Sequence, residues 1–387
     1  GFWDTGMAVG ARLDEPLTLG YSAAGQVIAV GAGLEGSYQT GDRVAMAGAG
    51  IANHAELNVV PENLVAKIPD GVSDEEACYG TVGAIALHAT RNLKVGLGDV
   101  VAIIGCGLVG QLAARFLTLA GARVVAVDYA YDRLELAMQL GAELAIKPSD
   151  DPGASIRGIS GNRGADAVLI SAATSSSEPF EVAADIARDR AQVVMVGLTG
   201  TTFPYQTFMQ KELTLTVSRS YGPGRYDPDF EQRGVKYPEG WVRWTETENL
   251  SETLRLMQPD NAARLDVSAF TSHTFDLNDA DNAYALVTAG KERHLGVVLS
   301  YSESTPDQTA TRKITERPTP KSGSAVLGMA GAGNFARAVL IPALKSSNNA
   351  RLKTLSTQRG ANAEHGANSY GFELATTDNQ IIWDDPE

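Results

Sequence analysis

The sequence predicts an α/β protein in which a doubly wound parallel sheet follows a β-rich region. Three observations predict this fold class. Short apolar runs in residues 1–92 are separated by Gly, Pro and Asp, as in strands joined by turns. From Asp99, runs of four to six apolar residues alternate with amphipathic stretches, as in a parallel sheet covered by helices. A second strand, glycine turn and helix begin at Ala325.

The individual elements follow from local periodicity. Short strands are expected in the β-rich region, over residues 26–30, 43–46 and 56–60. Runs that are apolar on both faces predict buried parallel strands over residues 100–104, 123–127, 167–170 and 192–196. A further strand is expected over residues 213–218. Helices are expected over residues 108–119 and 133–140.

Composition excludes several classes. The 387 residues suffice for two or three domains, and the formal charge of −14 disfavours nucleic-acid binding. No apolar run reaches the ~18 residues of a membrane span. Cys78 and Cys106 are the only cysteines, too few for a disulfide framework. With no visible signal or transit peptide, a cytoplasmic location is expected. Because the chain opens at Gly1 in mid-pattern, both ends are expected to be cut.

A glycine-rich turn after the first buried strand predicts a nucleotide site. The strand over residues 100–104 leads into the pattern G-x-G-x-x-G, which opens a helix. The first glycine allows the tight turn, the second lets a pyrophosphate approach, and the third lets helix and strand pack closely. The helix N-terminus offers N–H groups to the phosphates. The candidate cofactor-binding residues are Gly105, Gly107, Leu108, Val109, Gly110, Asp128 and Arg133.

The acid at the end of the second strand predicts which cofactor binds. Asp128 lies 23 residues after Gly105, where a carboxylate can accept both ribose hydroxyls and repel a 2′-phosphate. NAD(H) is therefore favoured. Arg133 leaves NADP(H) possible, because its cation could lie over the adenosine ribose.

Motifs around this turn carry a family resemblance. Residues 19–27 (LGYSAAGQV), 41–44 (GDRV) and 68–77 (IPDGVSDEEA), with the glycine turn, resemble the medium-chain dehydrogenase/reductase family of alcohol-dehydrogenase-like enzymes. The resemblance covers residues 15–300. It implies a GroES-like substrate domain, a Rossmann NAD(P)-binding domain and an active site in the cleft between them. The resemblance implies that residues 1–92 and 266–300 form the GroES-like domain and that residues 93–265 form the Rossmann domain.

The resemblance breaks at the metal positions. Zinc-dependent members carry Gly-His-Glu in the first motif, and this chain has Gly20-Tyr21-Ser22 there. A second ligand position falls near Thr81, and the short segment 47–50 replaces the family's four-cysteine lobe. Because zinc takes N, S or carboxylate ligands, the site is expected to hold no metal. The remaining ligand position would lie before Gly1.

Without a metal, side chains must polarise the substrate oxygen. Tyr21 and His54 are the candidate catalytic residues: a phenol at a lost ligand position, and an imidazole suited to acid–base work. The alternatives are an aromatic ring that fills space and a structural histidine at a strand start. His88, on an apolar helix, is expected to be a core histidine.

Residues 218–246 interleave aromatic and charged side chains, a composition that suits a sugar. Arg225, Tyr226 and Arg243 are the candidate substrate contacts; the alternative is an ordered surface excursion or an oligomer contact. This segment also resembles two-module oxidoreductases, in which a zinc-free medium-chain dehydrogenase is fused to a Gfo/Idh/MocA-type module. Such proteins are often associated with cell-surface polysaccharide synthesis.

The C-terminal part fits that picture. Polar residues 301–322 predict a linker, and residues 323–387 a partial Gfo/Idh/MocA-type Rossmann unit that stops before the family's Glu-Lys-Pro motif. A G-x-G-x-x-A turn predicts a second NAD(P) site, and Arg359 after the next strand suits a 2′-phosphate or leaves the choice open. The candidate residues are Gly331, Gly333, Asn334 and Phe335.

The predicted function is zinc-independent hydride transfer between NAD(P) and a carbonyl or alcohol carbon of a sugar or nucleotide sugar. Two alternatives stay open: a quinone- or enoyl-reductase-like activity on C=C bonds, and a catalytically silent scaffold for the second module. A small-molecule substrate and self-association into a homo-oligomer are expected, with neither nucleic acid nor membrane as a partner.

Overall fold

The computed structural model describes residues 18–290, 292–302, 311–314, 325–346 and 350–386. The chain divides into two compact units, of which one comprises Gly20–Ser302 and the other Glu303–Glu387 together with Gly1–Leu19. Each unit is described by itself. Among the described residues, helices are all too short or too polar to cross a bilayer.

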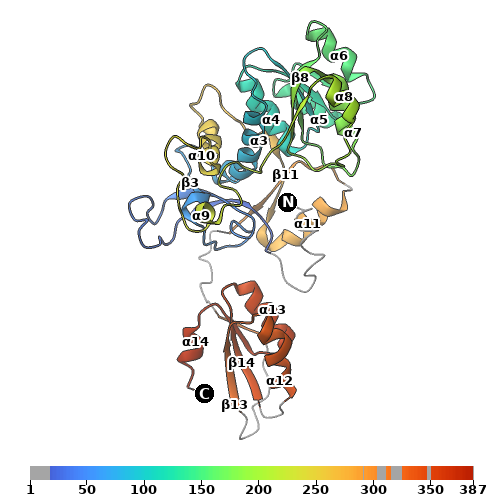
Figure 1. Ribbon diagram of the computed structural model, residues 1–387. Coiled ribbons are helices and arrows are strands. Elements are labelled where there is room, and N and C mark those ends of the chain that lie inside the picture. Colours follow the sequence, from blue (N-terminus) through green and yellow to red (C-terminus); the bar gives the residue numbers. More distant parts are fainter. Residues whose placement is uncertain (1–17, 291, 303–310, 315–324, 347–349, 387) are drawn as a thin grey trace. The chain divides into compact units, whose positions relative to one another are not determined.

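A six-stranded parallel sheet forms the centre of the larger unit (Figure 1). Its order is β6 (Leu144–Ile146), β5 (Arg123–Val127), β4 (Val100–Ile104), β7 (Ala165–Ile170), β8 (Ala187–Met195) and β9 (Thr214–Val217). In chain order these strands run 3-2-1-4-5-6, so the winding reverses between β4 and β7. The predicted doubly wound sheet is confirmed.

Alternate residues of β4 enter two different cores, which explains why this strand is apolar on both faces. Val101 and Ile103 pack in the core that includes α3 (Gly80–Asn92) and α4 (Leu108–Leu119). Val100 and Ala102 pack on the opposite face, in the core that holds Phe180 of α7 (Glu178–Ile186). Both faces of the sheet are therefore covered by helices (Figure 1).

The larger unit also contains two smaller sheets, one of three strands and one of two. The antiparallel strands are β1 (Ser22–Gln26), β2 (Arg43–Ala47) and β3 (Val65–Lys67), and the parallel pair is β10 (Thr271–Asp276) with β11 (Gly296–Ser300). The remaining helices of this unit are α2 (Asp74–Ala77), α5 (Tyr131–Gln139), α6 (Pro152–Ile159), α8 (Tyr205–Gln210), α9 (Pro228–Glu231), α10 (Glu246–Met257) and α11 (Ala280–Ala289), with the short 3₁₀ turns η1 (Glu62–Leu64), η2 (Ser268–Phe270) and η3 (Leu277–Asp279).

Two of the short strands expected from local pattern are wrong. Beyond β1 only Val27 of residues 27–30 keeps backbone pairing: its N–H donates to the Asp42 carbonyl, and its carbonyl accepts the Gly41 N–H. Residues 56–60 form no strand, and Val59 is 96% exposed. Alternating apolar residues indicate a strand only where a partner strand lies alongside, and none does here.

The smaller unit contains a four-stranded sheet of order β12 (Thr311–Lys313), β15 (Leu374–Thr376), β14 (Ala350–Ser356) and β13 (Ala325–Ala330). The last three are parallel, and β12 is antiparallel to β15. Its helices are η4 (Ala336–Leu340), α12 (Ile341–Ser346), α13 (Gly360–Tyr370) and α14 (Gln380–Trp383). The linker predicted over residues 301–322 lies largely outside the described residues. It is wrong at β12, because those residues pair with β15.

Candidate cofactor and substrate site

The turn after β4 needs glycine at both ends for reasons of space. Gly105 has a φ of +94°, and a Cβ there would lie 2.6 Å from the Cα of Ala172. A Cβ on Gly110 would overlap the carbonyl oxygen of Gly105 and lie 2.9 Å from the Ser171 Oγ. These contacts match the tight turn and the close helix–strand packing expected of the first and third glycines.

The middle glycine has the opposite surroundings. A Cβ on Gly107 would meet no heavy atom within 4 Å. Helix α4 begins at the next residue without a side-chain cap, so its first N–H groups point out unpartnered beside this open space. Open space next to a helix N-terminus is the shape and polarity that a pyrophosphate requires. The turn therefore fits a dinucleotide.

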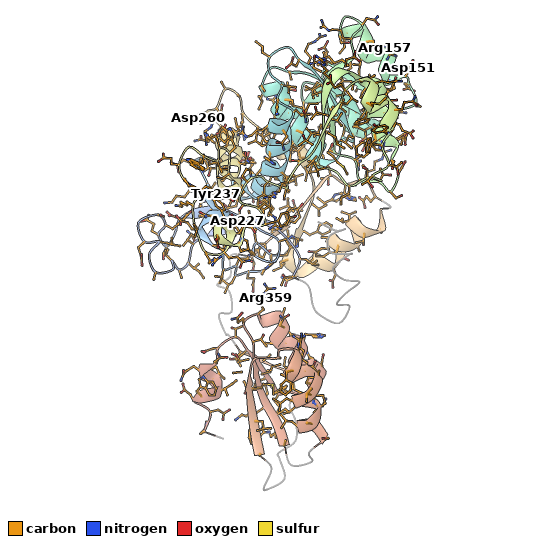
Figure 2. All side chains as sticks on the ribbon, in the orientation of Figure 1. Asp151, Arg157, Asp227, Tyr237, Asp260 and Arg359 are labelled. Atoms are coloured by element: carbon orange, nitrogen blue, oxygen red, sulfur yellow. The ribbon has the colours of Figure 1, made fainter. Side chains whose placement is uncertain are left out.

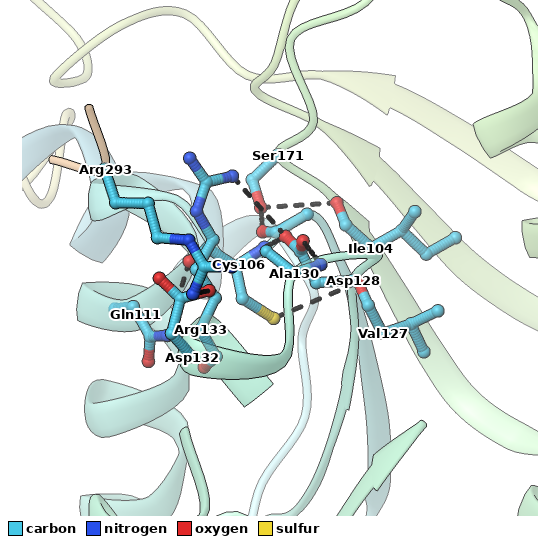
Figure 3. Close-up of polar contacts among 11 residues, drawn as sticks. Ile104, Cys106, Gln111, Val127, Asp128, Ala130, Asp132, Arg133, Ser171 and Arg293 are labelled. Atoms are coloured by element: carbon cyan, nitrogen blue, oxygen red, sulfur yellow. Dashed lines mark hydrogen bonds and ion pairs between the residues drawn. The ribbon is translucent and has the colours of Figure 1, made fainter. Parts of the chain in front are cut away.

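Asp128 lies directly beside this turn, at the end of β5 (Figure 3). One carboxylate oxygen accepts the N–H of Cys106 at 2.6 Å, and the other accepts that of Ala130 at 2.8 Å. The Arg133 guanidinium approaches the carboxylate to 3.8 Å. Gln111 braces the arrangement by donating to the carbonyls of Cys106 and Arg133. The carboxyl group is thus held in place, with lone pairs left for a ribose.

Two further observations complete this region. The Cys106 side chain is buried, and burial raises the pKa of its thiol to about 12, in keeping with a small filler. Arg293, from the segment between α11 and β11, lies 3.3 Å from Asp132 and close to Arg133 (Figure 3). Sequence reasoning missed Arg293, because it is distant in the chain and carries no motif.

The structure packs the His54 ring against Gly20, the residue that precedes Tyr21 in the chain. Gly20 has a φ of +99°, and a Cβ there would lie 2.5 Å from the His54 Cδ2 and 2.9 Å from its Nε2. The Tyr21 carbonyl accepts the Gly48 N–H, which ties the residue to the loop after β2. Burial raises the pKa of the Tyr21 phenol and lowers that of the His54 imidazole. The other ring edge of His54 contacts Tyr284 of α11 through Nδ1, a partner that sequence reasoning missed.

The family's metal positions hold poor zinc ligands. Tyr21 supplies a phenol, and the buried Thr81 hydroxyl donates to the Met46 carbonyl at 3.1 Å. Structural and catalytic zinc sites use thiolates, imidazoles and carboxylates. Throughout the part of the chain that the structure describes, three or more His, Cys, Asp or Glu side chains gather nowhere in a way that could hold a metal. The donors at these two positions do not fit zinc.

The three candidate substrate contacts are divided between two places. Arg225 pairs with the buried Glu231 at 2.7 Å, and its guanidinium lies 4.1 Å from the Tyr226 ring centroid. Tyr226 itself is 62% exposed. Arg243 instead stacks on Trp244 at 3.7 Å and bonds the Glu248 carboxylate. Arg225 is therefore engaged inside the protein, and Tyr226 offers the accessible ring.

The rest of this loop is tied down by its own polar groups. Asp227 and Tyr237, labelled in Figure 2, are joined by a 2.8 Å hydrogen bond, and Tyr237 stacks on Phe230. Lys236 pairs with Glu62 of η1 at 3.1 Å. The loop is thus held by contacts among its own residues and with η1 in the β-rich part of the same unit.

A buried carboxyl group that sequence reasoning missed lies at the start of α10. Glu246 is 2% exposed, and neither of its oxygens has a hydrogen-bond partner. The Tyr221 hydroxyl is likewise unpartnered. Both line a space, shared with Thr81 and Leu250, that is too narrow to admit water. Burial, followed by the charge of Glu231, raises the pKa of Glu246 to about 9. In the sequence Glu246 is one ordinary acid in a helix's first turn.

The glycine turn of the smaller unit is open on all sides. Gly331 has a φ of +95°, and its N–H donates to the Ser356 carbonyl at 2.7 Å. A Cβ on Gly331 or Gly333 would meet no heavy atom within 4 Å, and Phe335 is 70% exposed. Arg359 follows β14 at the N-cap of α13. No carboxylate occupies the place that Asp128 has in the larger unit.

Comparison with known proteins places this geometry in a class. Residues 109–233 match the family of zinc-binding dehydrogenases. The D-xylulose reductase of Scheffersomyces stipitis is 28% identical over 72% of this chain and 81% of its own length. The (R,R)-butanediol dehydrogenase of Bacillus subtilis is 34% identical over 35% of this chain and 45% of its own length. Among solved structures, the alcohol dehydrogenase of Thermus sp. ATN1 superimposes with a TM-score of 0.59 at 22% identity, over 77% of this chain and 90% of that one.

A doubly wound sheet with an open glycine turn and an acid beside it is the architecture of a dinucleotide-binding domain. The similarity to named dehydrogenases supports an oxidoreductase with an alcohol-dehydrogenase-like fold.

Proposed function

We propose that the chain is a zinc-independent dehydrogenase acting on a polyol, sugar or nucleotide sugar, with NAD(H) as its favoured cofactor. The observation that carries this proposal is Asp128, held by two backbone N–H groups beside the glycine turn and its open space at Gly107. A carboxylate in this place accepts ribose hydroxyls and repels a 2′-phosphate. Arg133 and Arg293 lie close enough to keep NADP(H) possible.

The chain's own residues would bind and orient the reactants. The N–H groups at the start of α4 would hold the pyrophosphate, and Asp128 the adenosine ribose. Bound NAD(P) would supply or accept the hydride. Tyr21 and His54 would polarise a substrate oxygen or exchange its proton.

Support for the substrate class comes from two sources. The names of the D-xylulose reductase and butanediol dehydrogenase relatives indicate substrates with neighbouring oxygen functions. The exposed ring of Tyr226, backed by Arg225, could stack on the apolar face of a sugar. A nucleotide sugar used in surface polysaccharide synthesis is the finer form of this proposal, and it depends on the resemblance of the loop.

Zinc independence depends on the donor types at two positions. Tyr21 and Thr81 stand where the zinc-dependent relatives are expected to have metal ligands, and Thr81 is already engaged with the Met46 carbonyl. Elemental analysis of the purified protein tests this part of the proposal. One zinc per chain would overturn it.

For the smaller unit we propose a second NAD(P) site of Gfo/Idh/MocA type. Its support is the open turn at Gly331–Phe335 and the cation of Arg359 after the next strand. The domain boundaries given above, self-association and a cytoplasmic location stay predictions.

The proposal is tested first by fluorescence titration with NADH and, separately, with NADPH, and then by turnover. The panel contains NAD⁺ with xylitol, sorbitol, butane-2,3-diol and a nucleotide sugar, and NADH with quinones and enones. Saturable NADH binding with turnover of a polyol or sugar supports the proposal. Turnover confined to quinones or enones would favour C=C reduction, and binding without any turnover would favour a silent scaffold.

A further inference from the structure

The imidazole of His54 is held between two parts of the larger unit that are far apart in sequence. Its Cδ2–Nε2 edge lies against Gly20, beside Tyr21, so closely that a side chain on Gly20 would overlap it. Its Nδ1 is hydrogen-bonded to the Tyr284 hydroxyl of α11, 230 residues further along the chain. The two rings lie 5.9 Å apart and are tilted by 43°. One ring edge therefore packs against Gly20, next to Tyr21 in the chain, and the other faces a phenol.

The tautomer of His54 determines what Nε2 can do. In a neutral imidazole one nitrogen carries the proton and the other holds a lone pair, and a phenol can accept from an Nδ1–H or donate to an Nδ1 lone pair. When Nδ1–H donates to the Tyr284 oxygen, Nε2 is left with its lone pair toward Gly20 and Tyr21. In this tautomer His54 can act as a base on that side.

Other ionisable groups around His54 cannot replace Tyr284. Tyr301 lies next to Tyr284, and its hydroxyl interacts with the backbone of Ala55, not with the imidazole. Glu56 is close enough to raise the pKa of Tyr301, and burial raises the pKa of Tyr284. Both phenols thus stay protonated near neutral pH. His54 as a residue is exposed, which gives a small molecule access to its side chain.

We propose that Tyr284 is a positioning residue that holds His54 in its Nδ1–H tautomer, with Nε2 as the base for alcohol oxidation. This inference rests on the proposed function, which it deepens. In the step, the O–H bond of the alcohol breaks and its proton goes to Nε2. The carbinol C–H breaks with its electron pair as a hydride that reduces NAD(P)⁺, and a C=O bond forms. His54 leaves the step as an imidazolium whose Nδ1–H still donates to Tyr284. Reduction is the reverse.

The test combines NMR with kinetics on the full chain. Long-range ¹H–¹⁵N spectra of the wild-type protein report the tautomer and pKa of His54, with His54→Gln used to assign its signals. Wild type is expected to show the Nδ1–H tautomer. In Tyr284→Phe the imidazolium loses an acceptor, so the pKa of His54 should fall by about 0.5–1 unit. Tyr301→Phe is the matched control, because it removes a neighbouring phenol that does not contact the ring, and it should leave both quantities unchanged.

Kinetics with xylitol and NAD⁺ follow the same variants. Tyr284→Phe should lower kcat about tenfold and move the acidic limb of the pH profile to lower pH, with KM changed less than about twofold. His54→Gln should lose about a hundredfold or more in kcat, and Tyr301→Phe should retain wild-type activity.

The possible results separate this inference from the function on which it rests. An Nε2–H tautomer in wild type overturns it, and this measurement remains decisive if Tyr284→Phe does not fold. Equal effects of Tyr284→Phe and Tyr301→Phe also overturn it. If wild type oxidises no member of the panel, the proposed function fails, and the expected tautomer and pKa shift would then support only the His54–Tyr284 arrangement.

Discussion

Two buried carboxyl groups in the larger unit, Asp128 and Glu246, have opposite environments. Asp128 is 8% exposed, accepts two backbone N–H groups and has a guanidinium nearby. Glu246 is 2% exposed and accepts none. A buried anion is tolerated only where donors replace water, so the surroundings of Asp128 suit a carboxylate, whereas burial favours the protonated form of Glu246.

The difference shows that burial of an acid does not by itself indicate a binding site. The donors around Asp128 come from the glycine turn, so the same backbone that would hold a pyrophosphate also prepares a carboxylate for a ribose. The neighbours of Glu246 include the carboxylate of Glu231, whose partner is Arg225. Arg225 lowers the pKa of Glu246 but does not offset its burial. The first carboxyl is built to bind, and the second costs stability at neutral pH.

The largest expected effect comes from replacing the unpartnered acid. Between pH 4.5 and about 9 the unfolded chain releases the Glu246 proton and the folded chain retains it, so wild-type stability falls as pH rises. Glu246→Gln carries no such proton. It should raise the free energy of unfolding by about 3 kcal/mol at pH 7, and the gain should vanish near pH 4. Denaturant unfolding at both pH values measures this.

A control tests whether the gain depends on burial. Glu239 lies in the same loop and is exposed, so Glu239→Gln should change stability by less than about 0.5 kcal/mol at either pH. If Glu246→Gln gives no gain at pH 7, Glu246 is ionised in the folded chain and the contrast with Asp128 does not hold.

The second expected effect concerns the acid that has donors. Asp128→Ala should weaken NADH binding by about 1–3 kcal/mol, because charge-assisted bonds to the ribose are lost. Fluorescence titration measures the change. Asp132→Ala is the comparison, since Asp132 lies on the neighbouring turn of α5 and pairs with Arg293 instead. Unchanged NADH affinity in Asp128→Ala would show that the nucleotide site has been assigned to the wrong residues.

A smaller effect should come from the turn itself, without any change of charge. Because a Cβ on Gly107 meets only open space, Gly107→Ala should leave stability within about 0.5 kcal/mol of wild type. The methyl group would occupy the place of the pyrophosphate, so NADH affinity should fall about tenfold. Gly96→Ala, equally open and located before the opposite end of β4, should change neither quantity. If Gly107→Ala binds NADH as tightly as wild type, the pyrophosphate does not bind beside Gly107.

How much the sequence could predict differs between these two carboxyl groups. Asp128 was predictable, because strand, glycine turn and terminal acid are close in sequence and their geometry follows from local rules. Strand β4 was predictable for the same reason, since its apolar run has the length of one buried strand. Glu246 and the His54–Tyr284 pair depend on segments that meet only after folding. Residues 56–60 failed as a strand because the pattern cannot supply a partner.

The smallest expected effect tests the cation beside Asp128. Arg133 is 42% exposed and lies 3.8 Å from the carboxylate, so solvent screens the pair and Arg133→Ala should change stability by less than about 1 kcal/mol. Its loss should weaken NADPH binding by about two- to fivefold, because a 2′-phosphate would lose a positive neighbour, and leave NADH binding within about twofold. Titrations with both cofactors measure the ratio. A fall in NADH affinity larger than the fall for NADPH would mean that Arg133 orients Asp128 rather than selecting the cofactor.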